Sequence, residues 1–121
     1  MGVVHIPWYA NGFRHHKLAD ALAGIAPIAL RYGANWYQVH RYRDDLYKFL
    51  QVAEFDNKFD FDRYWAGPEF TDFRVICSSW YQVPVLYSWS DLVATGALGS
   101  EENGNGTAAA APAEQGGGVA G

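Results

Sequence analysis

Strand-like and helix-like segments alternate in a fixed order along the first 95 residues of this chain. Segments rich in β-branched and aromatic residues predict strands, and apolar residues spaced three and four apart predict helices. In chain order we expect strands at 3–10, 35–43, 46–56 and 81–91, and helices at 13–32 and 60–80. The order βαββαβ predicts a ferredoxin-like α+β fold, with a four-stranded antiparallel sheet and two helices on one face. Right-handed crossovers then give the spatial strand order 4-1-3-2.

Proline, glycine and asparagine positions refine the predicted elements. We expect Asn11 to cap the first helix, Pro27 to kink or restart it, and Gly33 to end it. The Gly-Pro pair at 67–68 should break the second helix into two pieces. Pro7 indicates an edge position or a bulge near the end of the first strand.

The composition changes abruptly after residue 95. The segment 96–121 contains eight glycines in 26 residues and no Lys, Arg or aromatic residue. Such a segment buries too little apolar surface to offset its chain entropy, so it predicts a disordered tail after a 1–95 domain. The tail has a formal charge of -3 and the domain of -1, so we expect no nucleic-acid partner.

Several classes of protein are excluded by what the sequence lacks. The longest apolar runs fall short of the roughly 18 residues that span a bilayer, so no membrane partner is expected. The start of the chain lacks the features of a signal peptide. Cys77 is the single cysteine, which excludes an intrachain disulfide and fits a cytoplasmic location. We expect Cys77 to be a small buried apolar residue rather than a nucleophile.

The second and third strands are predicted to form a hairpin that turns at Asp44-Asp45. If Arg43 pairs with Leu46, the alternation of side chains assigns every residue to one of two faces, and any even loop length gives the same assignment. The first face, expected beneath the helices, holds Tyr37, Val39, Leu50 and Val52. The second face holds Trp36, Gln38, His40, Tyr42, Tyr47, Phe49, Gln51, Ala53 and Phe55.

The second face would be too apolar to remain in water and too polar for an ordinary core. A patch of so many aromatic side chains exceeds what a soluble monomer usually exposes. We therefore expect a second copy of the chain to cover it, giving a two-fold symmetric homodimer with a cavity between the sheets. A cavity lined by aromatic rings, imidazole and amide groups suits an aromatic small molecule.

In its element order, the chain resembles the dimeric α+β barrel superfamily, which includes the antibiotic-biosynthesis monooxygenases. The resemblance covers about residues 3–92 and rests also on the 47–55 strand and the helix start at 59–65. It implies a homodimer with a pocket between the sheet and the helices of each subunit. It also implies activities such as cofactor-free oxygenation of aromatic polyketides, haem degradation or lactone isomerisation. A shared fold does not choose among these.

Haem degradation is disfavoured within that resemblance. Haem-degrading members combine an Asn on the first strand with Trp and His on the second helix. Asn11 and Trp65 could stand in for two of these residues, but Val75 occupies the position expected for the His. No histidine occurs between residues 57 and 80. We therefore expect no cofactor.

His40 is the candidate catalytic residue, because an imidazole in an aromatic pocket can exchange protons with a phenolic substrate. The alternative is a histidine that only hydrogen-bonds Gln38 or Gln51. The candidate substrate-binding residues are Trp36, Gln38, Gln51, Phe49, His5, Tyr9, Trp65 and Arg74.

Each of the outlying candidates also has a structural interpretation. His5 can be an ordinary polar residue of a strand, and Trp65 can be a core residue. Arg74 can form a surface pair with Asp72 or Glu69. His15 and His16 are adjacent, so they diverge by about 100° on a helix and are expected to be solvated rather than to bind metal.

Two functions remain open at this point. The first is a homodimer that binds or transforms an aromatic or polyketide-like molecule, with cofactor-free oxygenation as the reaction considered. The second is a non-catalytic dimerisation module whose aromatic face is simply the subunit interface.

Overall fold

The computed structural model describes residues 1–99, so most of the segment predicted as a disordered tail lies outside the described residues. Residues Met1–Asp91 form one compact unit, and residues 92–99 do not belong to it. All of the secondary structure discussed below lies in the first unit. In chain order the elements are β1 (Gly2–Tyr9), α1 (His15–Ile25), the 3₁₀ helix η1 (Ala26–Tyr32), β2 (Ala34–Arg41), β3 (Lys48–Phe55), α2 (Lys58–Ala66), α3 (Pro68–Ile76) and β4 (Ser88–Ser90).

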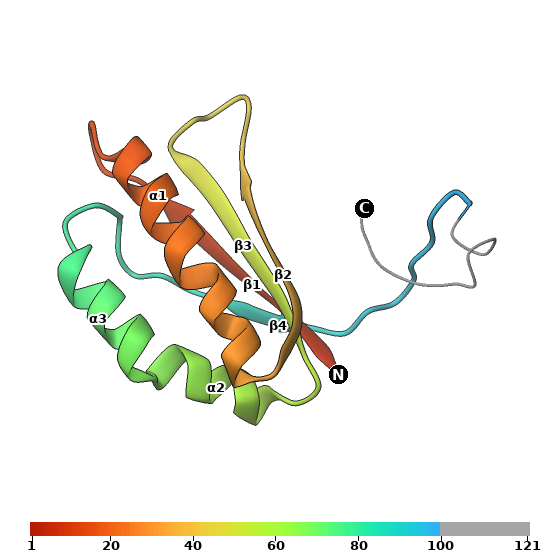
Figure 1. The fold of residues 1–121 in the computed structure, drawn as a ribbon. Coiled ribbons are helices and arrows are strands. Elements are labelled where there is room, and N and C mark those ends of the chain that lie inside the picture. The colour runs from red at the N-terminus through yellow and green to blue at the C-terminus, as the bar shows by residue number, and fades with distance from the viewer. Residues whose placement is uncertain (100–121) are drawn as a thin grey trace. The chain divides into compact units, whose positions relative to one another are not determined.

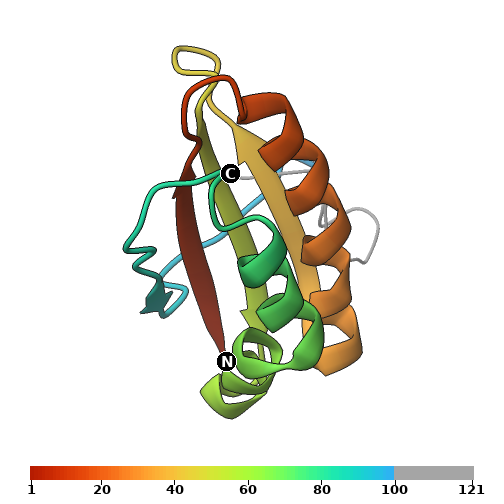
Figure 2. The same cartoon turned by 90° about the vertical axis from the view of Figure 1, so that its left-hand side faces the viewer.

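The four strands form one antiparallel sheet, and the helices cover one of its faces. The spatial order is β2-β3-β1-β4, which confirms the predicted order of 4-1-3-2 read from the other edge. Figure 1 shows α1, α2 and α3 to the left of and below the strands, and the rotated view in Figure 2 shows them all on the same side of the sheet. The ferredoxin-like α+β fold is therefore confirmed. The opposite face of the sheet is called the helix-free face below.

The last strand is much shorter than predicted. Only Ser88–Ser90 pair with β1, whereas Tyr81 makes an isolated bridge to Ala10. Between them, Pro84 has no backbone N–H and cannot continue a ladder. The alternating pattern of 81–91 predicted a continuous strand, and that prediction is wrong for residues 82–87.

Pro7 lies in an interior strand, but at a place where one neighbour is missing. The backbone N–H of Ala10 donates to Tyr47, and the carbonyl of Tyr9 accepts from the N–H of Gln82. The odd-numbered residues of β1 therefore direct their backbone groups toward the β4 side. Pairing with β4 ends at His5, so no β4 residue lies opposite Pro7. The missing N–H of Pro7 therefore costs the sheet no hydrogen bond.

The β2–β3 register differs from the prediction by one residue. Arg41 pairs with Phe49 and His40 with Leu50, and this register continues to the pair of Trp36 with Glu54. A bulge lies between Ala34 and Trp36. The N–H of Tyr42 donates to Lys48, which leaves five residues in the connection rather than two. An odd number of residues reverses the alternation, so the predicted pairing of Arg43 with Leu46 is wrong.

This shift divides the predicted aromatic face between the two sides of the sheet. Four of its members, all on β3, are buried beneath the helices: Phe49, Gln51, Ala53 and Phe55. Leu50 and Val52, which were expected beneath the helices, lie instead on the helix-free face with Trp36, Gln38 and His40. A single face carrying the whole aromatic set, as expected from the sequence, does not exist.

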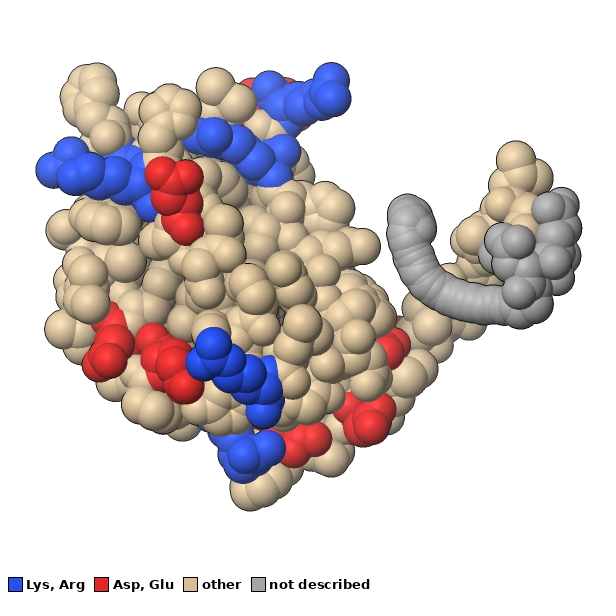
Figure 3. All heavy atoms as spheres, viewed as in Figure 1, with Lys and Arg blue, Asp and Glu red and all other residues tan. Residues whose placement is uncertain are grey.

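Charged side chains are distributed unevenly between the two ends of the Met1–Asp91 unit. The end where the β1–α1 and β2–β3 connections meet carries five of the nine basic residues, namely Arg14, Lys17, Arg41, Arg43 and Lys48. It carries only three acidic residues, Asp20, Asp44 and Asp45. Figure 3 shows blue side chains gathered at the upper end and most of the red ones in the lower half.

The first helical segment restarts near Pro27 and ends at Gly33, as predicted, but its N-cap is not the predicted residue. Pro27 lies in the first turn of η1, and Gly33 closes that helix with φ 102°. The predicted Asn11 cap is wrong, because the N-cap position of α1 is Arg14. The Asn11 amide donates instead to the carbonyl oxygens of Ser79 (2.9 Å) and Tyr81 (3.2 Å).

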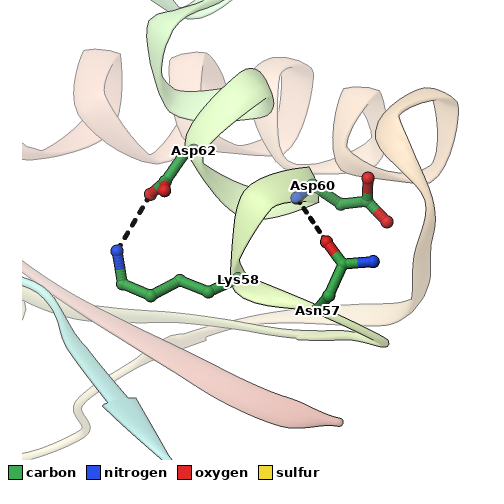
Figure 4. Close-up of polar contacts among 4 residues, drawn as sticks. All are labelled: Asn57, Lys58, Asp60 and Asp62. Carbon is green, nitrogen blue, oxygen red and sulfur yellow. Dashed lines mark hydrogen bonds and ion pairs between the residues drawn. The ribbon is translucent and has the colours of Figure 1, made fainter.

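The second helical segment is divided at Gly67 and Pro68, as predicted. Pro68 is the first residue of α3, and Gly67 is both the C-cap of α2 and the N-cap of α3. The N-terminus of α2 is capped by Asn57, whose side-chain oxygen accepts a hydrogen bond from the Asp60 N–H at 2.9 Å (Figure 4). Lys58, the first residue of α2, forms an exposed ion pair at 3.0 Å with Asp62, which lies one turn further along the helix.

Candidate functional site

The helix-free face of the sheet has an aliphatic centre with polar groups around it. In one row across the strands, His5 of β1 pairs with Val52 of β3, which pairs with Gln38 of β2. In the adjacent row, Pro7 pairs with Leu50, which pairs with His40. The other residues on this face are Val3, Tyr9, Trp36, Lys48, Glu54 and, on β4, Ser88 and Ser90. Five sequence-predicted site residues are therefore brought onto one face: His5, Tyr9, Trp36, Gln38 and His40.

His40 has one ring nitrogen engaged and the other available. Its Nε2 lies 3.0 Å from Oε1 of Gln38, two residues earlier on the same strand. A Gln side-chain oxygen only accepts hydrogen bonds, so Nε2 carries the hydrogen and donates it. In the neutral imidazole Nδ1 is then the acceptor, and within residues 1–99 no hydrogen bond to it is found. The contact with Gln38 that the sequence suggested is thus compatible with a basic nitrogen on the face.

His5 reaches the same state through a different partner. The Ser90 hydroxyl donates its hydrogen to the carbonyl of Val3 at 3.0 Å. The 3.2 Å contact between Nε2 of His5 and Oγ of Ser90 must therefore be donated by the imidazole. This leaves Nδ1 of His5 as an acceptor as well. Two imidazole acceptors consequently lie on the helix-free face, on opposite sides of the β3 strand.

Trp36 and Tyr9 supply aromatic surface at the margins of this face. Their side chains are 37% and 39% exposed, whereas Val3 and Val52 are 8% and 7% exposed. The Tyr9 hydroxyl donates to a carboxylate oxygen of Asp45 at 2.8 Å. That hydrogen bond, with the nearby negative charge, raises the pKa of Tyr9. Tyr9 is therefore held in place at the margin of the face and is a poor proton donor to a ligand.

The other side of the sheet carries a buried polar network centred on Gln51. Its Oε1 accepts from Nε1 of Trp8 at 3.1 Å, and its Nε2 donates to the Tyr64 hydroxyl at 3.0 Å. That hydroxyl in turn donates to the carbonyl of Ile25 at 2.7 Å. Burial raises the pKa of Tyr64 far above its ordinary value. The network joins the sheet to α2 and to the end of α1, and its role is structural.

Aromatic rings fill the space between the sheet and the helices. Trp8 stacks on Phe70 with ring centroids 6.1 Å apart and meets Phe73 and Tyr81 edge to face. Trp65 packs against Phe70 at 4.8 Å, in line with the core interpretation of this residue. A pocket between the sheet and the helices, as the family resemblance implied, would have to displace these rings.

Four predicted site residues consequently lie away from His40. Phe49 and Gln51 are buried beneath the helices, and Trp65 belongs to the aromatic cluster. The Arg74 guanidinium lies 4.4 Å from the centre of the Trp65 ring and donates to the Trp65 carbonyl at 2.8 Å. Within the described residues Arg74 forms no ion pair with Asp72 or Glu69, so the expected surface pair is absent.

Two open grooves lie on the surface of the Met1–Asp91 unit. One of 430 Å³ is lined by Lys17, Asp20, Ala21, Cys77 and Trp80. The other, of 240 Å³, lies at the unpaired part of the β1 edge and is lined by Pro7, Trp8, Tyr9, Lys48, Gln82, Val83 and Pro84. Cys77 is buried, as predicted, and burial raises the pKa of its thiol. The second groove adjoins the helix-free face through Pro7, Tyr9 and Lys48.

His15, which was expected to be solvated, makes contacts with two other residues. Its Nδ1 accepts a hydrogen bond from the Arg41 guanidinium at 2.5 Å, and its ring lies 4.6 Å from that of Tyr47. Desolvation lowers the pKa of His15, and the charges of His16 and Arg41 add to that effect. No local pattern signals this contact, because it depends on the five-residue connection that folds Arg41 toward α1.

Residues 1–99 contain no group of three or more His, Cys, Asp and Glu side chains arranged to hold a metal ion. In the same part of the chain, no helix has both the length and the apolar character that crossing a membrane requires.

Comparisons with known proteins add a fold but no close relative. No family profile matches the sequence, and no curated protein matches it. A Nitrosomonas europaea protein assigned to the antibiotic biosynthesis monooxygenases superposes with a TM-score of 0.70 at 13% identity, over 78% of this chain and 100% of that one. PA3566 from Pseudomonas aeruginosa gives a TM-score of 0.69 at 16% identity, over 77% of this chain and 94% of that one.

A third similar structure is a variant of SnoaB, a cofactor-independent oxygenase from Streptomyces nogalater. Its TM-score is 0.65 at 17% identity, over 78% of this chain and 95% of that one. Identities this low establish the fold and not the activity. The chain therefore has the same ferredoxin-like α+β fold as these three structures.

Proposed function

We propose that this protein binds a planar aromatic small molecule on the helix-free face of its sheet, within a homodimer in which a second copy covers that face. The observation that carries the proposal is the arrangement of His5 and His40. Both imidazoles lie on the same face as the aliphatic strip of Pro7, Leu50 and Val52, and each has its Nε2 engaged, so that Nδ1 is the acceptor in the neutral form. Trp36 and Gln38 lie on the same face. Such a surface combines apolar contact with a few oriented polar groups, as small-molecule sites do.

A second copy of the chain is the simplest cover for this face. The central side chains Pro7, Leu50 and Val52 are apolar, and none of the helices of the Met1–Asp91 unit lies over them. A two-fold symmetric contact would place the same aliphatic strip of each copy opposite the other. The polar groups of the two copies would then surround any space left between the sheets.

The chemistry that this face supports is recognition and deprotonation of a phenol. A phenolic hydroxyl can donate a hydrogen bond to Nδ1 of His40, whose ring is oriented by Gln38. Proton transfer to that nitrogen would leave an electron-rich phenolate and an imidazolium. Arg74 and Gln51, which lie on the other side of the sheet, take no part in this binding.

Cofactor-free oxygenation is the second function we consider, and the likeness to SnoaB favours it. In this reaction the deprotonated phenol would supply the electrons to O₂. One oxygen atom would enter the substrate as a quinone carbonyl, and the other would leave as water. His40 is the group placed to accept the phenolic proton.

The test uses the full chain and alizarin, a planar hydroxyanthraquinone, as the probe. Light scattering measures the dimer, and quenching of tryptophan fluorescence measures binding of the dye. We expect His40→Ala to retain the dimer and to weaken dye binding about tenfold, the loss of one hydrogen bond. His16→Ala is the matched control, because His16 is exposed on α1 and lies outside the face.

The outcomes separate binding from simple dimerisation. Loss of the dimer in His40→Ala, or equal dye binding by both variants, would favour the non-catalytic module. A wild-type protein that is monomeric would contradict the covering of the face by a second copy. Oxygen consumption with the dye, lost in His40→Ala, would support the oxygenase.

A further inference from the structure

The basic end of the Met1–Asp91 unit also exposes two large apolar side chains. Phe13, in the β1–α1 connection, is 90% exposed, and Leu46, in the β2–β3 connection, is 51% exposed. The two connections touch, because the Phe13 N–H donates to the Tyr47 hydroxyl at 3.4 Å. Figures 1 and 2 both show these connections together at the upper end of the molecule.

The backbone at Phe13 adopts a conformation that its own chemistry disfavours. Its φ of 61° is in the left-handed region, where a bulky residue is rare. Strain of this kind persists only where the surrounding structure holds the backbone in place, and such residues cluster at functional sites. The Phe13 ring is almost fully exposed, so burial within this chain does not offset it.

The apolar side chains are flanked by cations without acidic partners. Arg14 follows Phe13, and Arg43 lies in the same connection as Leu46. Neither forms an ion pair within residues 1–99. One of the three carboxylates at this end, that of Asp45, is already engaged by the Tyr9 hydroxyl and the Tyr47 N–H.

We propose that this end, formed by residues 10–17 and 41–48, docks onto an anionic lipid surface. Phe13 and Leu46 would enter the headgroup region, and Arg14 and Arg43 would contact lipid phosphates or carboxylates. The choice of a bilayer over a protein follows from the shape of this end. Its apolar side chains stand on two separate loops, and neither groove described above includes them.

A bilayer interface accepts such separate insertions, whereas a protein partner needs a continuous complementary surface. The whole chain has a net charge of -4, so only this basic end, and not the chain as a whole, is attracted to anionic lipid. This attraction should therefore weaken steeply with salt. This association lies on the membrane surface and is distinct from the membrane span that the sequence excludes. It is independent of the ligand site on the helix-free face.

The experiment is sedimentation of the full chain with vesicles of phosphatidylcholine that contain about one-third phosphatidylserine, compared with pure phosphatidylcholine. We expect binding to the anionic vesicles only, decreasing as salt rises. The double variant Phe13→Ser/Leu46→Ser should reduce partitioning about tenfold or more. Arg14→Gln/Arg43→Gln should reduce it about 25-fold, since each cation near the surface contributes about fivefold.

Matched controls come from the opposite end of the molecule. Phe59→Ser removes an aromatic side chain that is 69% exposed on α2, and Arg31→Gln removes an exposed cation of η1. Both should partition like the wild type. Circular dichroism checks that every variant is folded. Because Phe13 and Leu46 lie off the helix-free face, the dye test above should be unaffected by their replacement.

Three results would overturn the proposal. The first is no binding of the wild type to anionic vesicles at low salt. The second is equal binding to both vesicle compositions. The third is salt-sensitive binding that survives Phe13→Ser/Leu46→Ser, which would identify this end as an electrostatic surface better suited to an acidic protein.

Discussion

The guanidinium of Arg41 donates a hydrogen bond to Nδ1 of His15, joining the end of β2 to the first turn of α1. An arginine has no acceptor atom and remains charged, so the imidazole must be neutral to make this contact. Protonation of His15 would replace a hydrogen bond by a repulsion between two cations. The strength of this link therefore depends on pH.

We predict that the folded protein loses stability as the pH falls below about 6.5, the ordinary pKa of histidine. Desolvation lowers the pKa of His15 in the folded state, so below that pH the unfolded chain binds a proton that the folded chain does not. The contribution is fully present above pH 6.5 and declines as acid approaches the lowered value. Thermal unfolding of the wild type and of His15→Gln, measured from about pH 5 to 8, should show the weaker pH dependence in the variant. Parallel pH profiles would contradict the assignment to His15.

Gln51→Leu should destabilise the fold by about 1–3 kcal/mol, because it leaves the Trp8 N–H without its acceptor in a buried position. Urea unfolding measures the change. Gln82→Leu is the control, since Gln82 is exposed, and it should change stability by less than about 0.5 kcal/mol. Equal effects of the two replacements would show that the buried network contributes little.

Asn57→Ala should cost about 1 kcal/mol, because its side chain caps the first turn of α2 (Figure 4). Lys58→Ala, at the next residue, removes only an exposed ion pair to Asp62 and should cost no more than about 0.5 kcal/mol. Urea midpoints of the two variants decide the comparison. A larger loss for Lys58→Ala would assign the stability of this turn to the ion pair.

The β2–β3 register can be tested with two neighbouring residues. Phe49 is 1% exposed beneath the helices, so Phe49→Ala should cost about 3–5 kcal/mol. Leu50 is on the helix-free face and only half-buried, so Leu50→Ala should cost clearly less in the monomeric reference state. Urea unfolding at the lowest workable protein concentration limits the contribution of any dimer. The reverse order would restore the register with Arg43 opposite Leu46.

The element order and the sheet topology were predictable because they depend on local periodicity and on general connection rules. Helix breaks at Pro27 and at Gly67-Pro68 were also predictable, since proline and glycine act through their own backbone chemistry. These features require no knowledge of how distant residues meet.

The assignment of residues to faces failed because it depended on one loop length. Asp44-Asp45 was interpreted as a two-residue turn, whereas Asp45 instead organises a longer connection. Its backbone carbonyl accepts from the Lys48 N–H, and its carboxylate accepts from the Tyr47 N–H and the Tyr9 hydroxyl. The last of these contacts comes from another strand and cannot be detected in the hairpin sequence alone.

The same error divided the predicted site. His5, Tyr9, Trp36, Gln38 and His40 share the helix-free face, and on β1 the residues on either side of His5, Val4 and Ile6, pack under the helices. Phe49 and Gln51 moved to the core with the change of register.

Pro7 has a consequence for how this protein behaves at high concentration. Opposite Pro7 the β4 ladder is absent, which opens a short stretch of sheet edge in the middle of the molecule. Unprotected edges recruit strands from neighbouring chains and seed fibrils. A strand from another chain would meet the backbone nitrogen of Pro7, which has no hydrogen to donate. Pairing of a further copy at this stretch of edge is therefore blocked at its first hydrogen bond.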